Sequence, residues 1–238
     1  MAAIDKRLSV ILIPGLLNTE DLWRDQVKAL TGLGDISATS EHRKFDNMNA
    51  IAGVILKQAP ARFALAGLSM GGYVAFEMLR QAPERVTKLA LLDTSPRPDT
   101  PEKAAQRRET IRFAGEYGLK RVLETMRPNL LHPKHANDPA IVTRLARMAA
   151  RVGVDGFARQ QTAIMNRADS RPLLPEIRCS TLVLCGREDA LTPPEVAGEM
   201  VDKIPNSRLV IIEECGHLSA IEQPEQVTAA MRAWLKGG

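Results

Sequence analysis

The chain has 238 residues, of which 45% are hydrophobic and 25% charged, and its formal net charge is +4 at pH 7. This composition is typical of a folded globular protein and excludes a disordered chain. No apolar run approaches the roughly 20 residues that a membrane helix needs, and the first residues lack the apolar core of a signal peptide. We therefore expect a cytoplasmic protein whose partner is neither a membrane nor a nucleic acid.

Short apolar runs alternate with amphipathic patterns along most of the chain. The apolar runs are rich in Val, Ile and Leu, which is typical of strands buried on both faces of a parallel sheet. They span residues 9–14, 62–66, 88–93, 181–185 and 208–212, with a weaker candidate at 36–39. Helical patterns span residues 22–30, 50–58, 70–81, 194–203 and 224–235. Strands that alternate with helices predict an α/β fold with a mostly parallel sheet of about six strands.

One connection breaks this alternation. More than eighty residues separate the strand at 88–93 from the strand at 181–185, and they carry only helix signals. Thr100-Pro101 and Asp138-Pro139 each combine an N-cap residue with a proline at the first helical position. A connection of this length must carry its own structure. We therefore predict a helical cap over residues 96–175, inserted into an α/β core that is formed by residues 1–95 and 176–238.

The inserted segment is basic. From Arg97 to Arg171 the chain holds 15 Lys and Arg against 8 Asp and Glu, a surplus of +7, so the remaining residues carry −3. A basic segment of this kind can steer anionic ligands toward a nearby site. The alternative is a solvated helix face, because three arginines share one face opposite three apolar residues. These are Arg144, Arg147 and Arg151 against Ile141, Leu145 and Met148.

The segment Gly67-Leu68-Ser69-Met70-Gly71 places a serine between a predicted buried strand and a predicted helix. It matches the pattern G-x-S-x-G, in which a sharp strand-to-helix turn strains the backbone at the serine and projects its hydroxyl outward. Gly67 and Gly71 fit this turn because strand and helix approach too closely there for a β-carbon. The amides that start the helix point toward any negative charge formed beside Ser69. The alternative is a serine that only caps the helix.

A serine needs a base to act as a nucleophile, and the chain has four histidines. His42 lies in a polar stretch. We expect His132 and His135 in a surface loop, because no nearby carboxylate or cysteine completes a metal site with them. His217 follows the predicted strand at 208–212, and a loop from that last strand can return over the sheet edge toward Ser69. His217 is therefore our candidate for the base.

The base needs an acid to orient it, and we expect this acid at the carboxyl end of a strand, where parallel sheets place their ligands. Asp189 lies in a turn-rich segment directly after the strand at 181–185. Asp93, at the end of the strand at 88–93, is the competing acid, and its alternative role is to cap a turn. Glu188, which directly precedes Asp189, is a further candidate for the acid. We favour Asp189.

The order Ser69, Asp189, His217 and the segments that carry these residues resemble the α/β-hydrolase superfamily. The segments are GLSMGG, LVLCGREDALTPP and CGHLSAIEQPEQV, and the resemblance covers essentially the whole chain. It implies a nucleophile, an acid and a base in that order, with a helical cap that shapes the pocket. Members of this superfamily often have a hairpin before the first strand. Only eight residues precede Ser9, so we expect no hairpin here.

The resemblance also implies the two backbone donors of an oxyanion hole. One is the N–H of Met70, the residue after Ser69. The other lies in the loop after the first strand, where many relatives have His-Gly and this chain has Pro14-Gly15. By that match the second donor is the N–H of Leu16, with Leu17 as the alternative.

Small serine esterases and enol-lactonases are the members that this chain resembles most. The resemblance implies a serine hydrolase that cleaves a small ester, lactone or thioester through an acyl-enzyme on Ser69. It implies no metal and no organic cofactor, and a small acyl substrate that is anionic if the basic cap steers it. Three alternatives use the same residues or fold: a lyase or carbon–carbon bond hydrolase, a cofactor-free perhydrolase or haloperoxidase, and a ligand-binding receptor. An intact triad favours an enzyme over a receptor.

Overall fold

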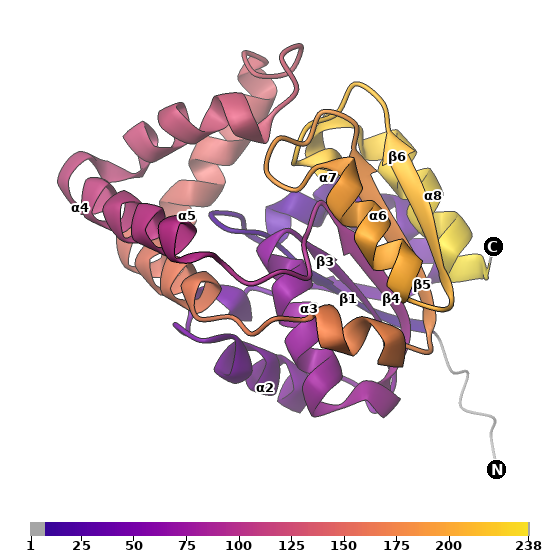
Figure 1. The fold of residues 1–238 in the computed structure, drawn as a ribbon. Coiled ribbons are helices and arrows are strands. Elements are labelled where there is room, and N and C mark those ends of the chain that lie inside the picture. The colour runs from indigo at the N-terminus through magenta and orange to yellow at the C-terminus, as the bar shows by residue number, and fades with distance from the viewer. Residues whose placement is uncertain (1–7, 238) are drawn as a thin grey trace.

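The computed structural model describes residues 8–237, and its six strands form one sheet (Figure 1). The strands are β1 (Leu8–Ile13), β2 (Gly34–Ala38), β3 (Phe63–Leu68), β4 (Val86–Leu92), β5 (Ser180–Gly186) and β6 (Ser207–Ile212). All neighbouring strands are parallel, and their order across the sheet is β2-β1-β3-β4-β5-β6. The predicted parallel sheet of about six strands is confirmed.

Both faces of the sheet are buried, which explains the continuous apolar runs. Side chains along a strand alternate between the two faces. In β1, Val10 and Leu12 belong to the apolar core on one face, while Ile11 and Ile13 belong to the core on the other. Each fully buried Leu or Ile adds about 1.5–3 kcal/mol to the free energy of unfolding.

Helices cover both faces. On one face lie α2 (Met48–Gln58), α3 (Met70–Gln81) and α6 (Pro194–Lys203), and on the other lie α1 (Arg24–Leu30) and α8 (Pro224–Lys236). All five were expected from the helical patterns. The patterns did not predict the short helix α7 (Ser219–Glu222) or the 3₁₀ turns η1 (Glu20–Trp23), η2 (Thr31–Leu33), η3 (Glu41–Arg43), η4 (Pro83–Arg85) and η5 (Arg171–Glu176).

Two long helices occupy the connection between β4 and β5. They are α4 (Pro101–Leu130) and α5 (Pro139–Met165), and they pack against each other beside the core, away from the C-terminus (Figure 1). Thr100 and Asp138 cap their first turns with side-chain hydrogen bonds. Each helix is broken at a glycine with left-handed backbone, Gly118 with φ 77° and Gly153 with φ 72°. Such a φ favours glycine, so these two residues let each helix change direction.

The topology of the sheet marks one place for a ligand. The chain moves from β1 to β2 on one side and then crosses to β3 on the other side of β1. Ligands of open α/β sheets bind where the winding reverses, at the carboxyl ends of the strands. Gly15 follows β1 there and Ser69 follows β3.

Two expectations about the organisation of the chain stay predictions. The expected absence of a hairpin before the first strand concerns residues 1–7, which lie outside the described residues. The exact division into a core and a cap at residues 95/96 and 175/176 stays a prediction. Between residues 8 and 237, no helix is both long and apolar enough to cross a membrane.

Candidate active site

Ser69 lies on the turn between β3 and α3, with φ 54° and ψ −116°. A positive φ is strained in a residue other than glycine, and such strain often occurs at functional turns. A β-carbon at Gly67 would lie 2.2 Å from the carbonyl oxygen of Gly71, and one at Gly71 would lie 2.1 Å from that of Ile13. The Ser69 side chain makes no capping hydrogen bond to α3, which argues against the helix-cap alternative.

Three side chains from separate loops meet at this turn. Ser69 Oγ lies 2.8 Å from Nε2 of His217. Nδ1 of His217 lies 2.8 Å and 2.9 Å from the two carboxylate oxygens of Asp189. The side chains of His217 and Asp189 are 3% and 0% exposed, so the contact between them is shielded from water. The structure thus brings together the three residues that the sequence singled out.

The electrostatics of the pair keep Asp189 charged and make His217 more basic. Burial alone raises the pKa of the Asp189 carboxyl, but the charge of His217 and the hydrogen bonds from His217 and Thr192 outweigh it and hold that pKa low. The carboxylate accepts from the N–H of Leu191 and from the N–H and hydroxyl of Thr192, at 2.7–2.9 Å. Burial alone lowers the pKa of His217, but the Asp189 charge outweighs it, so this pKa lies above the ordinary value of 6.5.

The loop after β1 runs beside Ser69. A β-carbon at Gly15 would lie 3.3 Å from Cβ of Ser69. The N–H of Leu17 is occupied, because it donates to Oε1 of Gln160 in α5 at 3.1 Å. The N–H groups of Leu16 and Met70 donate to no acceptor among residues 8–237. The N–H groups of Leu16 and Met70 are therefore free within the described residues, and the N–H of Leu17 is not.

Asp93 lies near this site but does not contact His217. Its Oδ1 accepts a hydrogen bond from the N–H of Gly186 at 3.1 Å, and its Oδ2 accepts from the N–H and hydroxyl of Ser219 at 3.2 Å and 2.5 Å. Burial raises the pKa of Asp93 most, and the charge of Asp189 raises it further, so that this pKa is about 8. Asp93 thus ties the loop after β5 to the histidine loop, and of these two carboxylates Asp189 is the one that contacts the imidazole.

Glu222 is a buried carboxylate that the sequence analysis did not single out. Its Oε1 accepts from the N–H groups of Gly216 and Leu218, which flank His217, at 3.1 Å and 3.2 Å. Its Oε2 accepts from the N–H of His132, just after α4, at 2.7 Å. Glu222 therefore links the histidine loop to the end of a cap helix. Its position five residues after His217 was the only signal in the sequence.

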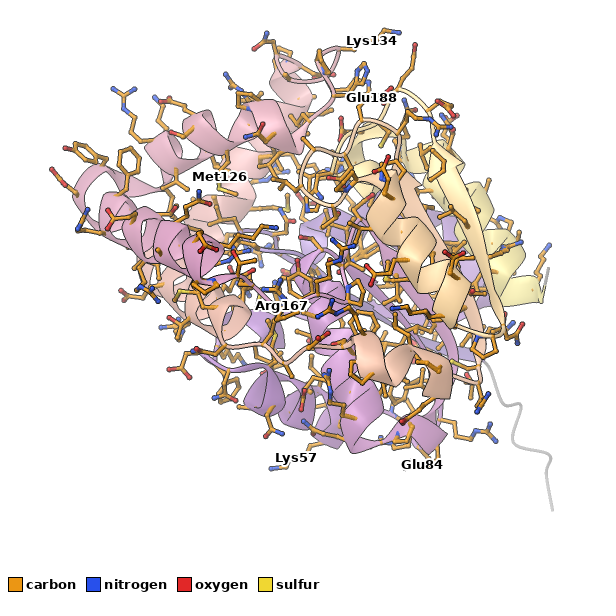
Figure 2. The ribbon with its side chains drawn as sticks, in the orientation of Figure 1. Lys57, Glu84, Met126, Lys134, Arg167 and Glu188 are labelled. Carbon is orange, nitrogen blue, oxygen red and sulfur yellow. The ribbon has the colours of Figure 1, made fainter. Side chains whose placement is uncertain are left out.

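The expectation for His132 and His135 is wrong in one respect: carboxylates do lie beside them. His135 Nδ1 lies 3.1 Å from Glu222, and His132 Nε2 lies 3.9 Å from Glu188. Figure 2 shows Lys134, between the two histidines in the chain, at the same end of the molecule as Glu188. The carboxylates come from the loop after β5 and from α7, so the local sequence around the histidines gave no sign of them.

His42 also departs from its polar sequence context, because its side chain is fully buried. Its Nε2 lies 3.0 Å from the carbonyl oxygen of Asn18. Burial disfavours the charged imidazolium and lowers the pKa of His42 to about 4. A neutral ring therefore packs behind the loop after β1, and it lies outside the set of residues around Ser69.

A cavity of about 640 Å³ opens in front of Ser69 and His217, between the core and the cap. Figure 2 shows Arg167 between the cap helices and α3, and Met126 on the cap side. Leu16, Leu123 and Ile164 give part of its wall an apolar character. Five charged residues also line it: Arg97, Asp99, Lys103, Arg107 and Arg167. The volume suits a small organic molecule with both apolar and charged parts.

The parallel sheet, the strained serine turn and the adjoining His-Asp pair define a protein of the α/β-hydrolase class. The model of the alpha/beta hydrolase family matches residues 10–230, so the chain belongs to this family. It is a hydrolase of an esterase-like branch.

Known proteins similar to this chain place it in that branch. It is 32% identical to a thermophilic esterase from Thermogutta terrifontis, with a TM-score of 0.87 over 96% of this chain and 89% of that one. It is 29% identical to the pimeloyl-(acyl-carrier protein) methyl ester esterase of Neisseria meningitidis serogroup B, over 91% of this chain and 84% of the relative. The enol-lactonase from Burkholderia xenovorans LB400, at 22% identity, shares the fold, with a TM-score of 0.86 over 99% of this chain and 94% of that one.

Proposed function

We propose that this hydrolase cleaves a small ester, lactone or thioester through an acyl-enzyme on Ser69. The observation that carries the proposal is the continuous contact from Ser69 Oγ through the His217 ring to the Asp189 carboxylate, at 2.8 Å and 2.8–2.9 Å. This arrangement activates a hydroxyl for acyl transfer. The similar esterases of Thermogutta terrifontis and Neisseria meningitidis support an ester as the substrate.

In the proposed reaction, Ser69 Oγ attacks the acyl carbon while Nε2 of His217 accepts the hydroxyl proton. The N–H groups of Leu16 and Met70 stabilise the negative oxygen of the tetrahedral intermediate. His217 then gives its proton to the leaving alcohol or thiol, and the acyl group remains on Ser69. A water molecule, deprotonated by His217, attacks the acyl carbon, and the carboxylic acid leaves as Ser69 regains its proton. Asp189 stabilises the imidazolium in both half-reactions.

The pH dependence of kcat/KM should follow His217. Because the base must be neutral to accept a proton, kcat/KM is expected to fall as the pH drops through the pKa of His217, which lies above 6.5. The measurement is a profile with a neutral ester between about pH 5 and about pH 9. A kcat/KM that stays constant down to about pH 5 would contradict His217 as the base.

Covalent labelling tests the nucleophile directly. A fluorophosphonate ester should add one phosphonyl group per chain, seen by intact mass, and peptide mapping should place it on Ser69. The Ser69→Ala variant should take up none. Ser95→Ala is the matched control, since Ser95 lines the same cavity without contacting His217, and it should label like the wild type. Labelling that persists in Ser69→Ala would sink the proposal.

We also propose that the substrate is anionic. Four cations but one carboxylate line the cavity. The similar Thermogutta esterase was solved with malate bound, and malate is a dicarboxylate. Anion attraction by a basic cavity accelerates association with such a substrate.

A further inference from the structure

Many arginines of the cap are neutralised by carboxylates and do not attract a ligand. Three of them, on one face of α5, pair with acids of η1 and α1 in the core. The pairs are Arg144 with Asp25 at 2.7 Å, Arg147 with Asp21 at 3.2 Å, and Arg151 with Glu20. The helix face that looked solvated in the sequence thus holds the cap to the core. Any charge that acts on a substrate must come from elsewhere.

The cavity contains a different arrangement, in which two arginines share one carboxylate. Asp99 has a side chain that is 1% exposed, and its oxygens accept from Arg107 Nε at 2.6 Å and Arg167 Nη1 at 2.7 Å. Burial alone raises the pKa of Asp99, but the two guanidinium groups outweigh it and hold this pKa low. Two cations against one anion leave one net positive charge at the cavity wall. The side chain of Arg107 is 24% exposed, so an anion in the cavity can approach this positive charge and is attracted by it.

The hydrogen-bond donors of the two arginines are used unequally. Arg167 stacks on the ring of Tyr73 at 4.2 Å and donates to Asp99 and to the carbonyl oxygens of Arg97 and Ile164. Arg107 donates from Nη1 to Oε1 of Gln161 at 2.7 Å. Its Nη2 has no acceptor among residues 8–237. Arg107 therefore retains free donors where it lines the cavity.

Lys103 lies one helical turn before Arg107 in α4 and lines the same cavity. Its Nζ makes no hydrogen bond or ion pair within residues 8–237. Two like charges at positions i and i+4 repel each other and destabilise a helix. A ligand anion held between them would remove this repulsion.

We infer that Arg107 and Lys103 form a subsite for a carboxylate of the substrate, so that the substrate class is a monoester of a dicarboxylic acid or a lactone that bears a carboxylate. This inference rests on the proposed ester hydrolysis. Contacts join the two ends of the site: Tyr73 lies one turn after Ser69 in α3, Arg167 stacks on Tyr73, and Asp99 joins Arg167 to Arg107. Apolar side chains of the cavity wall suit the hydrocarbon between ester and carboxylate. A planar guanidinium edge matches a carboxylate well.

Steady-state kinetics with two matched esters test the subsite. One is the monoethyl ester of adipic acid, and the other carries a primary amide in place of its free carboxylate. The wild type should prefer the carboxylate in kcat/KM by about tenfold or more, the size of a charge-assisted hydrogen bond. Arg107→Gln should lower this preference by about tenfold, and Lys103→Gln by about threefold.

Arg108→Gln is the control, because it removes the same charge one residue away, on a side chain that does not line the cavity. It should leave the preference unchanged. Thermal unfolding shows whether Arg107→Gln weakens the cap by removing the contact with Asp99. Lys103 makes no hydrogen bond or ion pair with Asp99, so Lys103→Gln keeps the test valid in that case. Inhibition by free adipate should exceed inhibition by inorganic phosphate at equal concentration.

Equal kcat/KM for the two esters in the wild type would overturn the subsite while leaving ester hydrolysis intact. An equal loss of preference in all three variants would also overturn it, since that pattern indicates long-range charge. Stronger inhibition by phosphate than by adipate would overturn the assignment of a carboxylate. If neither these esters nor p-nitrophenyl esters were hydrolysed and Ser69 did not label, the proposed function itself would fail.

Discussion

Replacing Ser69 with alanine is expected to lower kcat/KM for p-nitrophenyl butyrate by about 10⁴- to 10⁶-fold. The substitution removes the oxygen that lies 2.8 Å from His217 Nε2 and adds no atom to the turn. The free N–H groups of Leu16 and Met70 remain in place. They can still stabilise an oxyanion formed by direct attack of water, so a small residual rate above the uncatalysed reaction is expected.

The fold of this variant should be intact, and its Tm should lie close to that of the wild type, because the lost hydroxyl makes no capping hydrogen bond to α3. Ser95→Ala removes a hydroxyl from the same cavity and should keep kcat/KM within about tenfold of the wild type. A Ser69→Ala enzyme that retains a tenth of the wild-type rate would exclude an acyl-enzyme on Ser69.

The residues around Ser69 were predictable because each one follows a strand of the parallel sheet. The carboxyl ends of such strands share one edge. Ser69 follows β3, Asp189 lies in the loop after β5 and His217 in the loop after β6, so the pattern of strands alone predicts that their loops converge. Glycines at 67 and 71 added a local signal, since the close approach of strand and helix leaves no space for a β-carbon.

The residues that support this constellation could not be predicted in the same way, because their partners are remote in the sequence. Gln160 is 143 residues from Leu17, whose N–H it accepts, and Glu222 is 90 residues from His132. Hydrophobic periodicity carries no information about such pairs. His42 shows the opposite failure: its neighbours in the sequence are polar, but tertiary packing buries it fully beneath the loop after β1.

The breaks of α4 at Gly118 and of α5 at Gly153 also could not be predicted from the sequence. A single glycine inside a helical pattern costs about 1 kcal/mol relative to alanine and is often tolerated without a kink. Both glycines here take left-handed φ values, and a β-carbon at either one would meet no atom within 4 Å. Glycine is therefore favoured at these positions by the backbone conformation and not by a close approach of other atoms.

Asp189→Asn is expected to lower kcat/KM for the same ester by up to about 10⁴-fold. An asparagine can keep contact with His217 Nδ1, but it cannot stabilise the imidazolium, and its amide favours the wrong tautomer of the ring. The pKa of His217 should fall, because burial would then act without the opposing charge of Asp189. The acid limb of the residual kcat/KM profile should therefore move to lower pH than in the wild type.

Asp93→Asn is the comparison that separates the two carboxylates. Asp93 has a pKa raised to about 8 by burial, so at neutral pH it is mostly protonated, and asparagine resembles that neutral form. Its hydrogen bonds go to Gly186 and Ser219 and not to the imidazole. The variant should therefore lose less than about tenfold in kcat/KM, a loss that reflects altered support of the two loops.

The two variants together distinguish the candidates for the acid, provided that both unfold with a Tm near that of the wild type. A large loss in Asp189→Asn with a small loss in Asp93→Asn assigns the acid to Asp189. The reverse pattern would mean that Asp93 turns toward His217 during the reaction and that Asp189 only holds its loop. Comparable losses would indicate that the two buried carboxyl groups ionise as one coupled unit, which sets the pKa of His217.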